Sequence, residues 1–573
     1  MKSFKQLIKN TNTNSKSFEK LNLALLSDQS SQFLSKLIHK TGLDSDLNIF
    51  VWEAPIDQIE QQISNPSSEF NNSTFHTSIV FESSHALLKK YNCSNSNDDF
   101  ALVQFDRIKN YLDCLMNLSS SKIILFNFYE LNDGVYGNFS SKNKNSFIYQ
   151  LRKLNSLISD YACNLSRLTI LDISSIQNRL GSNNMFDPSL YINYGMVLSL
   201  DSLPFVSKNI VDIIFSQKAI FKKCLILDLD NTLWGGIIGD DGIENIELGN
   251  LGIGKSFVEF QYWIKKLKQR GIIICICSKN NEDIAKNVFL NHPDMVLKLE
   301  DISVFVANWD SKVDNIKNIQ KVLNIGFDSI VFLDDNPFER NSVKENIPHI
   351  TVPDLPKDPV NYLNYLYEQN LFETSSVSDL DKNRTNLYQT EYERIKIKTE
   401  YTDLSDYMKN LNMYSKVEFL SSFNIPRVSQ LSQRSNQFNL RTIRYDEDSL
   451  VKISNSDDSR GLVFDLKDKF GDYGIISFMV LKSKSLNEIF IENWAMSCRV
   501  LERGMEQFIF NYLLDYCKKN NINTIIAEYI ATKKNIIVKD LYFELGFSFK
   551  NDKFILNIDG TKNLITTIKE KNE

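Results

Sequence analysis

One stretch decides how this chain folds: Lys223-Cys224-Leu225-Ile226-Leu227-Asp228-Leu229-Asp230-Asn231-Thr232-Leu233-Trp234. The apolar run from Cys224 to Leu227 predicts a buried strand, and Asp228 and Asp230 follow where that strand opens into a loop. Two carboxylates in such a place can hold a divalent cation, or divide the roles of nucleophile and acid/base between them. The stretch therefore favours a phosphoryl-transfer site.

Two later apolar runs also end in polar side chains. Ser278 follows the first run, and Asp334 and Asp335 follow the second, with Lys312 near the start of a predicted helix between them. Each piece alone is weak, because aspartates after strands are common in turns and a lone helix lysine is usually solvated. In this order, and all at strand ends, they indicate one crevice of an open α/β sheet.

This constellation resembles the haloacid dehalogenase (HAD) superfamily of phosphotransferases. Phosphate chemistry then makes Asp228 the nucleophile at phosphorus, and Asp230 the acid that protonates the leaving oxygen and later activates water. The phosphate-binding residues would be Thr232, Ser278 and Lys312. Mg²⁺ would be held by Asp228, Asp230 (through its backbone carbonyl), Asp334 and Asp335.

Motifs in the loops narrow the resemblance to one family within this superfamily. Four motifs are similar to those of FkbH-like proteins: 227–236, 277–280, 332–340 and 436–440. The similarity extends over nearly the whole chain and is weakest before residue 180. It implies an enzyme that makes glyceryl thioesters on an acyl carrier protein from 1,3-bisphosphoglycerate. Phosphate would be lost on the way, and a cysteine-bound acyl intermediate would be involved.

The composition limits the number of domains and the class of protein. A chain of 573 residues with 42% hydrophobic side chains suggests roughly three or four domains with ample cores. The net charge of -6, with both signs mixed along the chain, argues against bulk nucleic-acid binding. No apolar run is long enough to span a membrane, and eight scattered cysteines fit a reducing compartment. We therefore expect a cytoplasmic protein without nucleic-acid or membrane partners.

The predicted fold class is α/β in three domains. An SGNH-hydrolase-like α/β domain is followed by a HAD Rossmannoid parallel sheet, a helical connector and a GNAT-like α+β acyltransferase domain. The expected boundaries are 1–215, 216–360, 361–400 and 401–573.

The first domain is predicted to be non-catalytic. Ser27 follows the first strand, where an SGNH-type esterase would carry its nucleophile. Such enzymes also need a late Asp-x-x-His, but this chain has Asp187-Pro188-Ser189-Leu190, without a histidine to deprotonate a serine. We therefore interpret Ser27 as a helix cap and the domain as a docking unit.

The last domain contains the candidate acyl site. GNAT enzymes cradle the coenzyme A pyrophosphate on an Arg/Gln-x-x-Gly-x-Gly/Ala loop, but here Glu502 stands where the first glycine belongs. A carboxylate repels pyrophosphate, so a phosphopantetheine arm is favoured over coenzyme A. Cys498 is the leading acyl carrier because it ends a strand near a predicted helix start. Further candidates are Cys277, Asn436, Arg499, Gly504, Asn535 and Tyr542.

Two other functions fit the same residues. One is a HAD phosphatase for a phosphosugar, coupled to acyl transfer in surface-polysaccharide biosynthesis. The other is a pathway scaffold in which only the middle domain is active.

Overall fold

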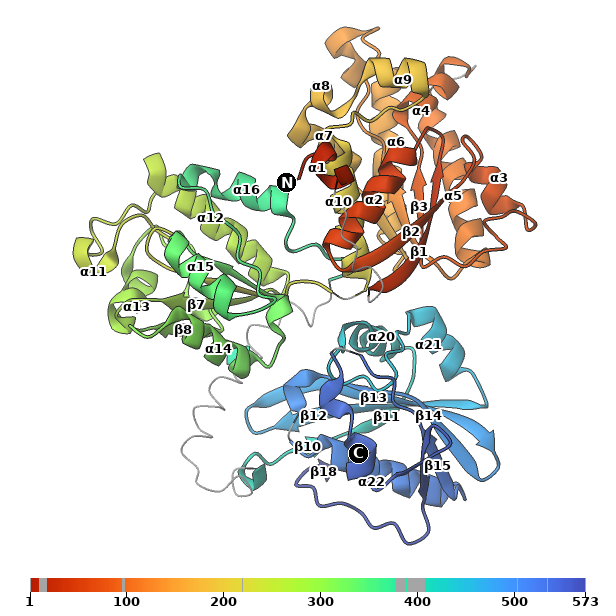
Figure 1. Ribbon diagram of the computed structural model, residues 1–573, viewed down its shortest axis with the longest axis vertical. Coiled ribbons are helices and arrows are strands. Elements are labelled where there is room, and N and C mark those ends of the chain that lie inside the picture. Colours follow the sequence, from red (N-terminus) through yellow and green to blue (C-terminus); the bar gives the residue numbers. More distant parts are fainter. Residues whose placement is uncertain are drawn as a thin grey trace. The chain divides into compact units, whose positions relative to one another are not determined.

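The computed structural model describes most of the chain (Figure 1). The described residues are 2–9, 18–94, 98–218, 220–377, 388–389, 408–501, 503–532 and 534–571. The chain divides into two compact units: Met1–Phe221 with Glu368–Ser376, and Lys222–Tyr367 with Val377–Glu573. Among the described residues, no helix combines the length and the apolar character needed to cross a bilayer.

The first unit is built on a five-stranded parallel sheet. In spatial order its strands are β2 (Leu47–Glu53), β1 (Glu19–Ser27), β3 (Thr77–Phe81), β4 (Lys122–Phe126) and β5 (Leu168–Leu171). Every residue of β3 is buried, as expected for a parallel strand that is covered on both faces. The parallel sheet confirms the predicted α/β class for this region.

Helices cover both faces of this sheet (Figure 1). One apolar core joins it to α1 (Phe4–Lys9), α2 (Gln32–Asp44), α7 (Ile173–Leu180), α8 (Ser182–Met185) and α10 (Leu203–Gln217). The other core joins it to α3 (Ile59–Ser64), α4 (Ser84–Asn92), α5 (Phe100–Leu118) and α6 (Phe147–Ala162). The unit also contains η2 (Gly137–Lys142) and α9 (Pro188–Tyr194). Leu25 and Leu26 enter opposite cores because strand side chains alternate.

The end of β1 differs from the prediction. Ser27 still belongs to β1, and α2 begins only at Gln32. The buried Ser27 hydroxyl accepts a hydrogen bond from the Gln29 backbone N–H (3.2 Å), so it closes a turn and does not cap the helix. Asp187 is itself a cap, because its carboxylate accepts two backbone N–H groups at the start of α9. The absence of catalysis in this unit stays a prediction.

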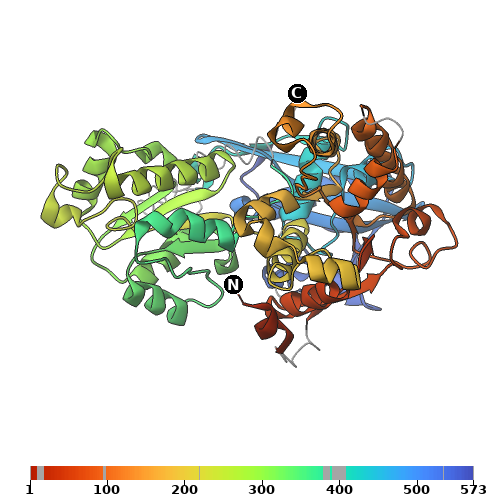
Figure 2. The same ribbon diagram turned by 90° about the horizontal axis from the view of Figure 1, so that it is seen from above.

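The second unit opens with the predicted Rossmannoid sheet. Its parallel strands, in spatial order, are β8 (Val304–Ala307), β7 (Ile273–Ser278), β6 (Cys224–Leu227) and β9 (Ile330–Leu333). The surrounding helices are α11 (Ile238–Asp241), α12 (Gly252–Gln269), α13 (Glu282–Asn291), α14 (Lys312–Leu323), α15 (Pro337–Asn346) and α16 (Tyr362–Gln369), with η3 (Leu299–Asp301), η4 (Phe327–Ser329) and η5 (Pro359–Asn361). Figure 2 shows helices on both sides of this green sheet. The strands are fully buried in β6, β7 and β9, which explains their continuous apolar sequences.

The C-terminal sheet is largely antiparallel, as predicted for an α+β domain. Its spatial order is β16 (Ser548–Lys550), β17 (Lys553–Asn557), β15 (Thr524–Ala527), β14 (Glu488–Met496), β13 (Gly471–Ser485), β12 (Ser459–Asp468), β10 (Tyr414–Ser415) and β18 (Lys569–Glu570), and β11 (Val417–Phe419) also pairs with β12. One core packs α20 (Ile425–Arg434) and α21 (Glu447–Ser454) on the sheet, and a second core contains α22 (Met505–Lys519) and α23 (Leu541–Glu544). Figure 1 shows α20 and α22 on opposite faces. Two turns, η6 (Cys498–Val500) and η7 (Ile536–Val538), complete the domain.

The predicted connector, 361–400, is only partly described. Helix α16 covers its beginning, while 378–387 and 390–407 lie outside the described residues. The predicted domain boundaries therefore stay predictions.

Asp28 carries a buried carboxyl next to the end of β1. Its Oδ2 accepts hydrogen bonds from the backbone N–H (2.8 Å) and hydroxyl (3.1 Å) of Ser83, while its Oδ1 is buried without a hydrogen-bond partner in the described structure. Burial raises the pKa of Asp28 to about 7; nearby Glu82 acts in the same direction, and the bonds from Ser83 oppose it.

We expect Asp28→Asn to remove a pH dependence from the stability of this unit. The folded pKa of about 7 lies above the ordinary 3.8, so the folded state retains a proton that the unfolded chain loses. The contribution of Asp28 to stability is therefore fully present below about pH 4 and is lost as the pH rises through about 7. Relative to the native chain, the variant should gain about 1–3 kcal/mol at pH 8 and much less near pH 5.

Urea-dependent hydrogen exchange of β1 and β3 peptides measures this difference. Asp160→Asn, on the exposed surface of α6, makes the same charge change and is the matched control. An identical pH profile in the Asp28 variant and the native chain would contradict the prediction.

Candidate active site

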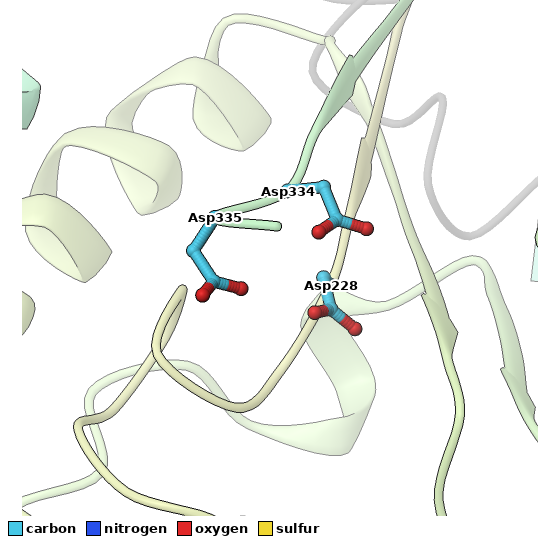
Figure 3. A group of neighbouring side chains, drawn as sticks. All are labelled: Asp228, Asp334 and Asp335. Atoms are coloured by element: carbon cyan, nitrogen blue, oxygen red, sulfur yellow. The ribbon is translucent and has the colours of Figure 1, made fainter. Parts of the chain in front are cut away.

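Three carboxylates meet at one edge of the sheet formed by β6 to β9. Asp228 directly follows β6, and Asp334 and Asp335 directly follow β9, its parallel neighbour. One oxygen of each lies within 4.8 Å of the others. Figure 3 shows the three side chains side by side. The parallel pairing of β6 and β9 therefore assembles residues that are more than a hundred positions apart in the sequence.

Lys312 neutralises part of this charge. Its Nζ lies 2.9 Å from Asp228 Oδ1 and 2.6 Å from Asp334 Oδ2, and its side chain is only 4% exposed. Burial alone would lower the pKa of Lys312, but the two carboxylates outweigh burial and raise it. Lys312 is therefore not a solvated helix lysine, which was the alternative for a lone lysine, and it enters the site at the first residue of α14.

Two of the three carboxylates, Asp334 and Asp335, have raised pKa values. Burial raises the pKa of Asp334 to about 7, and the Asp228 charge adds to this effect. Burial likewise raises the pKa of Asp335 to about 6, again with a contribution from Asp228. One lysine does not balance three clustered carboxylates, whereas a divalent cation would. The all-oxygen donor set fits Mg²⁺, with Asp228, Asp334 and Asp335 as its ligands.

Asp230 has a separate set of partners. Its Oδ1 accepts hydrogen bonds from Trp234 Nε1 (2.9 Å) and the Ile238 backbone N–H (3.1 Å), and its Oδ2 accepts one from Asn280 Nδ2 (3.0 Å). Its carboxylate does not belong to the three-oxygen cluster, so any part in metal binding falls to its backbone carbonyl, as predicted. Burial raises the pKa of Asp230. This setting suits a group that must deliver a proton.

The two predicted hydroxyl ligands of phosphate are both buried at this edge. Ser278 is the last residue of β7 and is 2% exposed. The Thr232 hydroxyl accepts a hydrogen bond from the Asp335 backbone N–H (3.2 Å), so it ties the two aspartate loops together. Thr232 thus has a positioning role in addition to the predicted binding role.

Two supporting residues were not assigned a role from the sequence. Asn280 orients Asp230, as described above, and Arg340 fixes the second aspartate loop. Arg340 Nη1 donates to the backbone carbonyls of Asp334 (2.8 Å) and Asp335 (2.6 Å). Asn280 lies in the motif 277–280 and Arg340 in the motif 332–340. Their place in these motifs was the sequence signal for a role in the site.

Three candidates for the acyl site are buried. Cys277 lies in the apolar core, and burial raises the pKa of its thiol well above the usual range, which disfavours the thiolate needed for acyl transfer. Asn535 is fully buried, and all its side-chain polar atoms already bond to neighbouring groups. Tyr542 is 1% exposed, and burial raises the pKa of its hydroxyl. Their burial identifies Cys277 and Asn535 as core residues and argues against ligand binding by all three.

The other candidates lie near the end of β14. Cys498 begins η6 and is half-buried, and Cys498 and Asn436 line one cavity of about 480 Å³. Arg499 belongs to the same turn. Gly504 adopts φ +80° and precedes α22, whose first residue is Met505. Cys498 follows the end of β14 at Met496 and precedes the start of α22 by several residues along the chain. Glu502, the basis for disfavouring coenzyme A, lies outside the described residues.

We expect Mg²⁺ to raise the unfolding temperature of the native chain, because it binds the folded carboxylate cluster preferentially. Asp335→Asn removes one ligand and should weaken Mg²⁺ binding by at least about tenfold in calorimetric titration. Asp310→Asn, on an exposed loop, is the matched control. Equal Mg²⁺ affinities for the two variants would show that Asp335 is not a ligand.

Comparison with known proteins identifies the family. The model of the FkbH N-terminal domain matches residues 22–215. The crystal structure of the N-terminal part of protein BF1531 from Bacteroides fragilis, described as containing a phosphatase domain complexed with Mg, is 48% identical. It covers 66% of this chain and is itself covered in full, with a TM-score of 0.63. No curated protein sequence matches.

Two acetyltransferases also match by structure, over a quarter of the chain. The ribosomal-protein-S18-alanine N-acetyltransferase from Escherichia coli is 18% identical, with 94% of it covered and a TM-score of 0.21. Spermidine N-acetyltransferase from Vibrio cholerae is 14% identical, with 96% of it covered and the same TM-score. Family membership rests on the longer match: this chain belongs to the FkbH-like family of the HAD superfamily.

Proposed function

We propose that the chain is a bifunctional enzyme: it removes phosphate at the Asp228 site and loads the resulting acyl unit onto an acyl carrier protein. The observation that carries the proposal is the buried cluster of Asp228, Lys312 and Asp334, with Asp335 beside it. The Mg-bound structure of the BF1531 fragment, which is 48% identical, supports Mg²⁺ as the cofactor.

Asp228 is the nucleophile of the phosphatase step. Its carboxylate attacks phosphorus, and the bond from phosphorus to the leaving oxygen breaks as Asp230 gives that oxygen a proton. Water then attacks the aspartyl-phosphate, passes a proton to Asp230 and releases inorganic phosphate. The dephosphorylated product has left with the proton from Asp230, and water has restored the Asp228 carboxylate and the Asp230 proton, so the cycle balances.

Lys312 and the neighbouring residues stabilise this reaction. The Lys312 ammonium offsets charge on the transferring phosphoryl group, and Ser278 offers a hydroxyl to its oxygens. Asn280 and Trp234 hold the Asp230 carboxyl in place. Bound Mg²⁺ would supply a positive charge that draws the phosphoryl oxygens toward Asp228 and lowers the repulsion between them.

The acyl half of the proposal assigns 1,3-bisphosphoglycerate as substrate. One of its phosphates is an acyl phosphate, so attack by a thiolate on the carbonyl carbon releases inorganic phosphate and forms a thioester. Removal of the other phosphate, an ester, then requires the Asp228 site. Exchange with the thiol of a phosphopantetheine arm transfers the glyceryl group to the carrier and regenerates the cysteine. Cys498 is the proposed carrier of the intermediate, because it is half-buried and lines a cavity.

We expect Asp228→Asn to lower the hydrolysis of phosphate esters by at least about a thousandfold, because the amide does not replace the nucleophile. Release of inorganic phosphate from simple phosphate esters measures the loss, because thiolate attack on an acyl phosphate does not need Asp228. Asp310→Asn serves again as the charge-matched control. Full phosphate release by the Asp228 variant would reject this site as the phosphatase centre.

We expect Cys498→Ser to abolish a glyceryl adduct that intact-protein mass spectrometry detects on the native chain after incubation with 1,3-bisphosphoglycerate. Carrier loading should fall with it, whereas hydrolysis of simple phosphate esters should remain, because the Asp228 site is unchanged. Cys163→Ser, at an exposed thiol of the first unit, is the control. An adduct that survives in the Cys498 variant would reject Cys498. Hydrolysis of phosphosugars without any adduct on enzyme or carrier would favour the phosphosugar phosphatase.

A further inference from the structure

Strands β14 and β15 pair in parallel only at their beginnings and then separate. Glu488–Phe490 pairs with Thr524–Ile526, but β14 continues to Met496, whereas β15 ends at Ala527. Past the paired stretch, the facing backbone groups of both segments need other partners, because buried N–H and C=O groups are costly to leave unbonded. A gap of this kind accepts an extended chain that carries amide groups.

Residues 438–441, which we call the gap segment, occupy this space on the β14 side. The gap segment runs antiparallel to β14. The Leu440 N–H donates to the Trp494 carbonyl (3.1 Å), and the Met496 N–H donates to the Phe438 carbonyl (3.0 Å). These are the bonds that an added strand would make.

The gap segment is also hydrogen-bonded on its other side, toward β15. The Ile530 N–H, in the chain that leaves β15, donates to the Leu440 carbonyl (2.9 Å). The buried Asn535 amide donates from Nδ2 to the carbonyls of both Asn439 and Ile530, each at 2.9 Å. Asn535 therefore clamps the gap segment to the β15 side, which accounts for its saturated side chain.

Side chains also hold the gap segment between β14 and β15. Phe438 is 2% exposed, and Asn439 and Leu440 are not exposed at all. Phe438 and Leu440 belong to the apolar core that contains α22. Arg441 spans the gap, because its Nη1 donates to a β14 carbonyl (2.8 Å) and its Nε pairs with Glu528 (2.7 Å). Withdrawal of the segment would expose core side chains and leave backbone groups of both strands without partners.

A pantetheine arm is the ligand whose chemistry best matches an open gap of this shape. It is extended and carries two amide groups, so it would pair with strand edges as the gap segment does. We propose that the gap segment is a built-in replacement for such an arm, and that it excludes coenzyme A and pantetheine from the space between β14 and β15. Thioester exchange at Cys498 therefore takes place outside this gap. Only the identity of the excluded ligand rests on the proposed acyl transfer; the closure rests on the bonds above.

Hydrogen exchange of the full chain tests this proposal, with coenzyme A and pantetheine as probes. We expect peptides that contain the gap segment and 494–496 to be strongly protected in the free protein and unchanged by about 1 mM of either probe. Calorimetric binding without a change in these peptides would locate the probe elsewhere and agree with closure. Rapid exchange in the free protein, or a change in these peptides on probe binding, would overturn the proposal.

A variant adds a second measurement. Arg441→Ala removes the contacts across the gap and should speed exchange in the gap segment by about tenfold. Arg460→Ala, at an exposed arginine whose bonds stay within its own turn, should not. Equal exchange in the two variants would overturn the role of Arg441, and circular dichroism verifies that both are folded. Neither measurement needs turnover, so the proposal can fail while the proposed function stands, or the reverse.

Discussion

The structure of the phosphatase site depends on one buried ammonium group. Asp228 and Asp334 end neighbouring parallel strands, so the sheet forces two like charges together at its edge. Lys312 lies between them at 2.9 and 2.6 Å and offsets part of their repulsion. Burial is the main cause of the raised pKa values of Asp334 and Asp335, and the Asp228 charge adds to it. Lys312 alone does not offset the negative charge of the three carboxylates. A bound cation would offset the rest, and Lys312 would then interact with the phosphoryl group of a substrate.

Further hydrogen bonds hold the carboxyl groups of the site and their loops in position. Asn280 and Trp234 hold Asp230, while Arg340 holds the carbonyls of the opposite loop. None of these groups needs to touch substrate, because they set the direction in which the reacting carboxyls point. In the C-terminal domain, the buried Asn535 amide likewise holds the backbone of the gap segment by a hydrogen bond. Arg340 and Asn535 each donate hydrogen bonds to backbone carbonyls of another segment.

The sequence predicted which polar residues meet at this edge of the sheet because strand ends carry local signals. Asp228, Ser278 and Asp334 each follow an apolar run, and the parallel topology then brings them together. Ser27 was wrongly assigned to a helix start, since strand β1 runs one residue past the apolar pattern. The buried state of Cys277 and Asn535, and the insertion of residues 438–441 between β14 and β15, depend on contacts between distant segments. Periodicity and motif spacing contain no information on such contacts. The strand β8 was also missed.

The hydrogen bond from the Asp335 N–H to the Thr232 hydroxyl has a consequence for how the site comes into being. It joins residues 103 positions apart, and the pairing of β6 with β9 joins residues 106 positions apart. Closing so long a loop costs entropy before any contact is gained, so such contacts form late in folding. The cation site therefore exists only once the chain through β9 has been synthesised and has docked. During synthesis, a nascent chain that ends before residue 330 holds no phosphatase centre, and cation capture marks the completion of this domain.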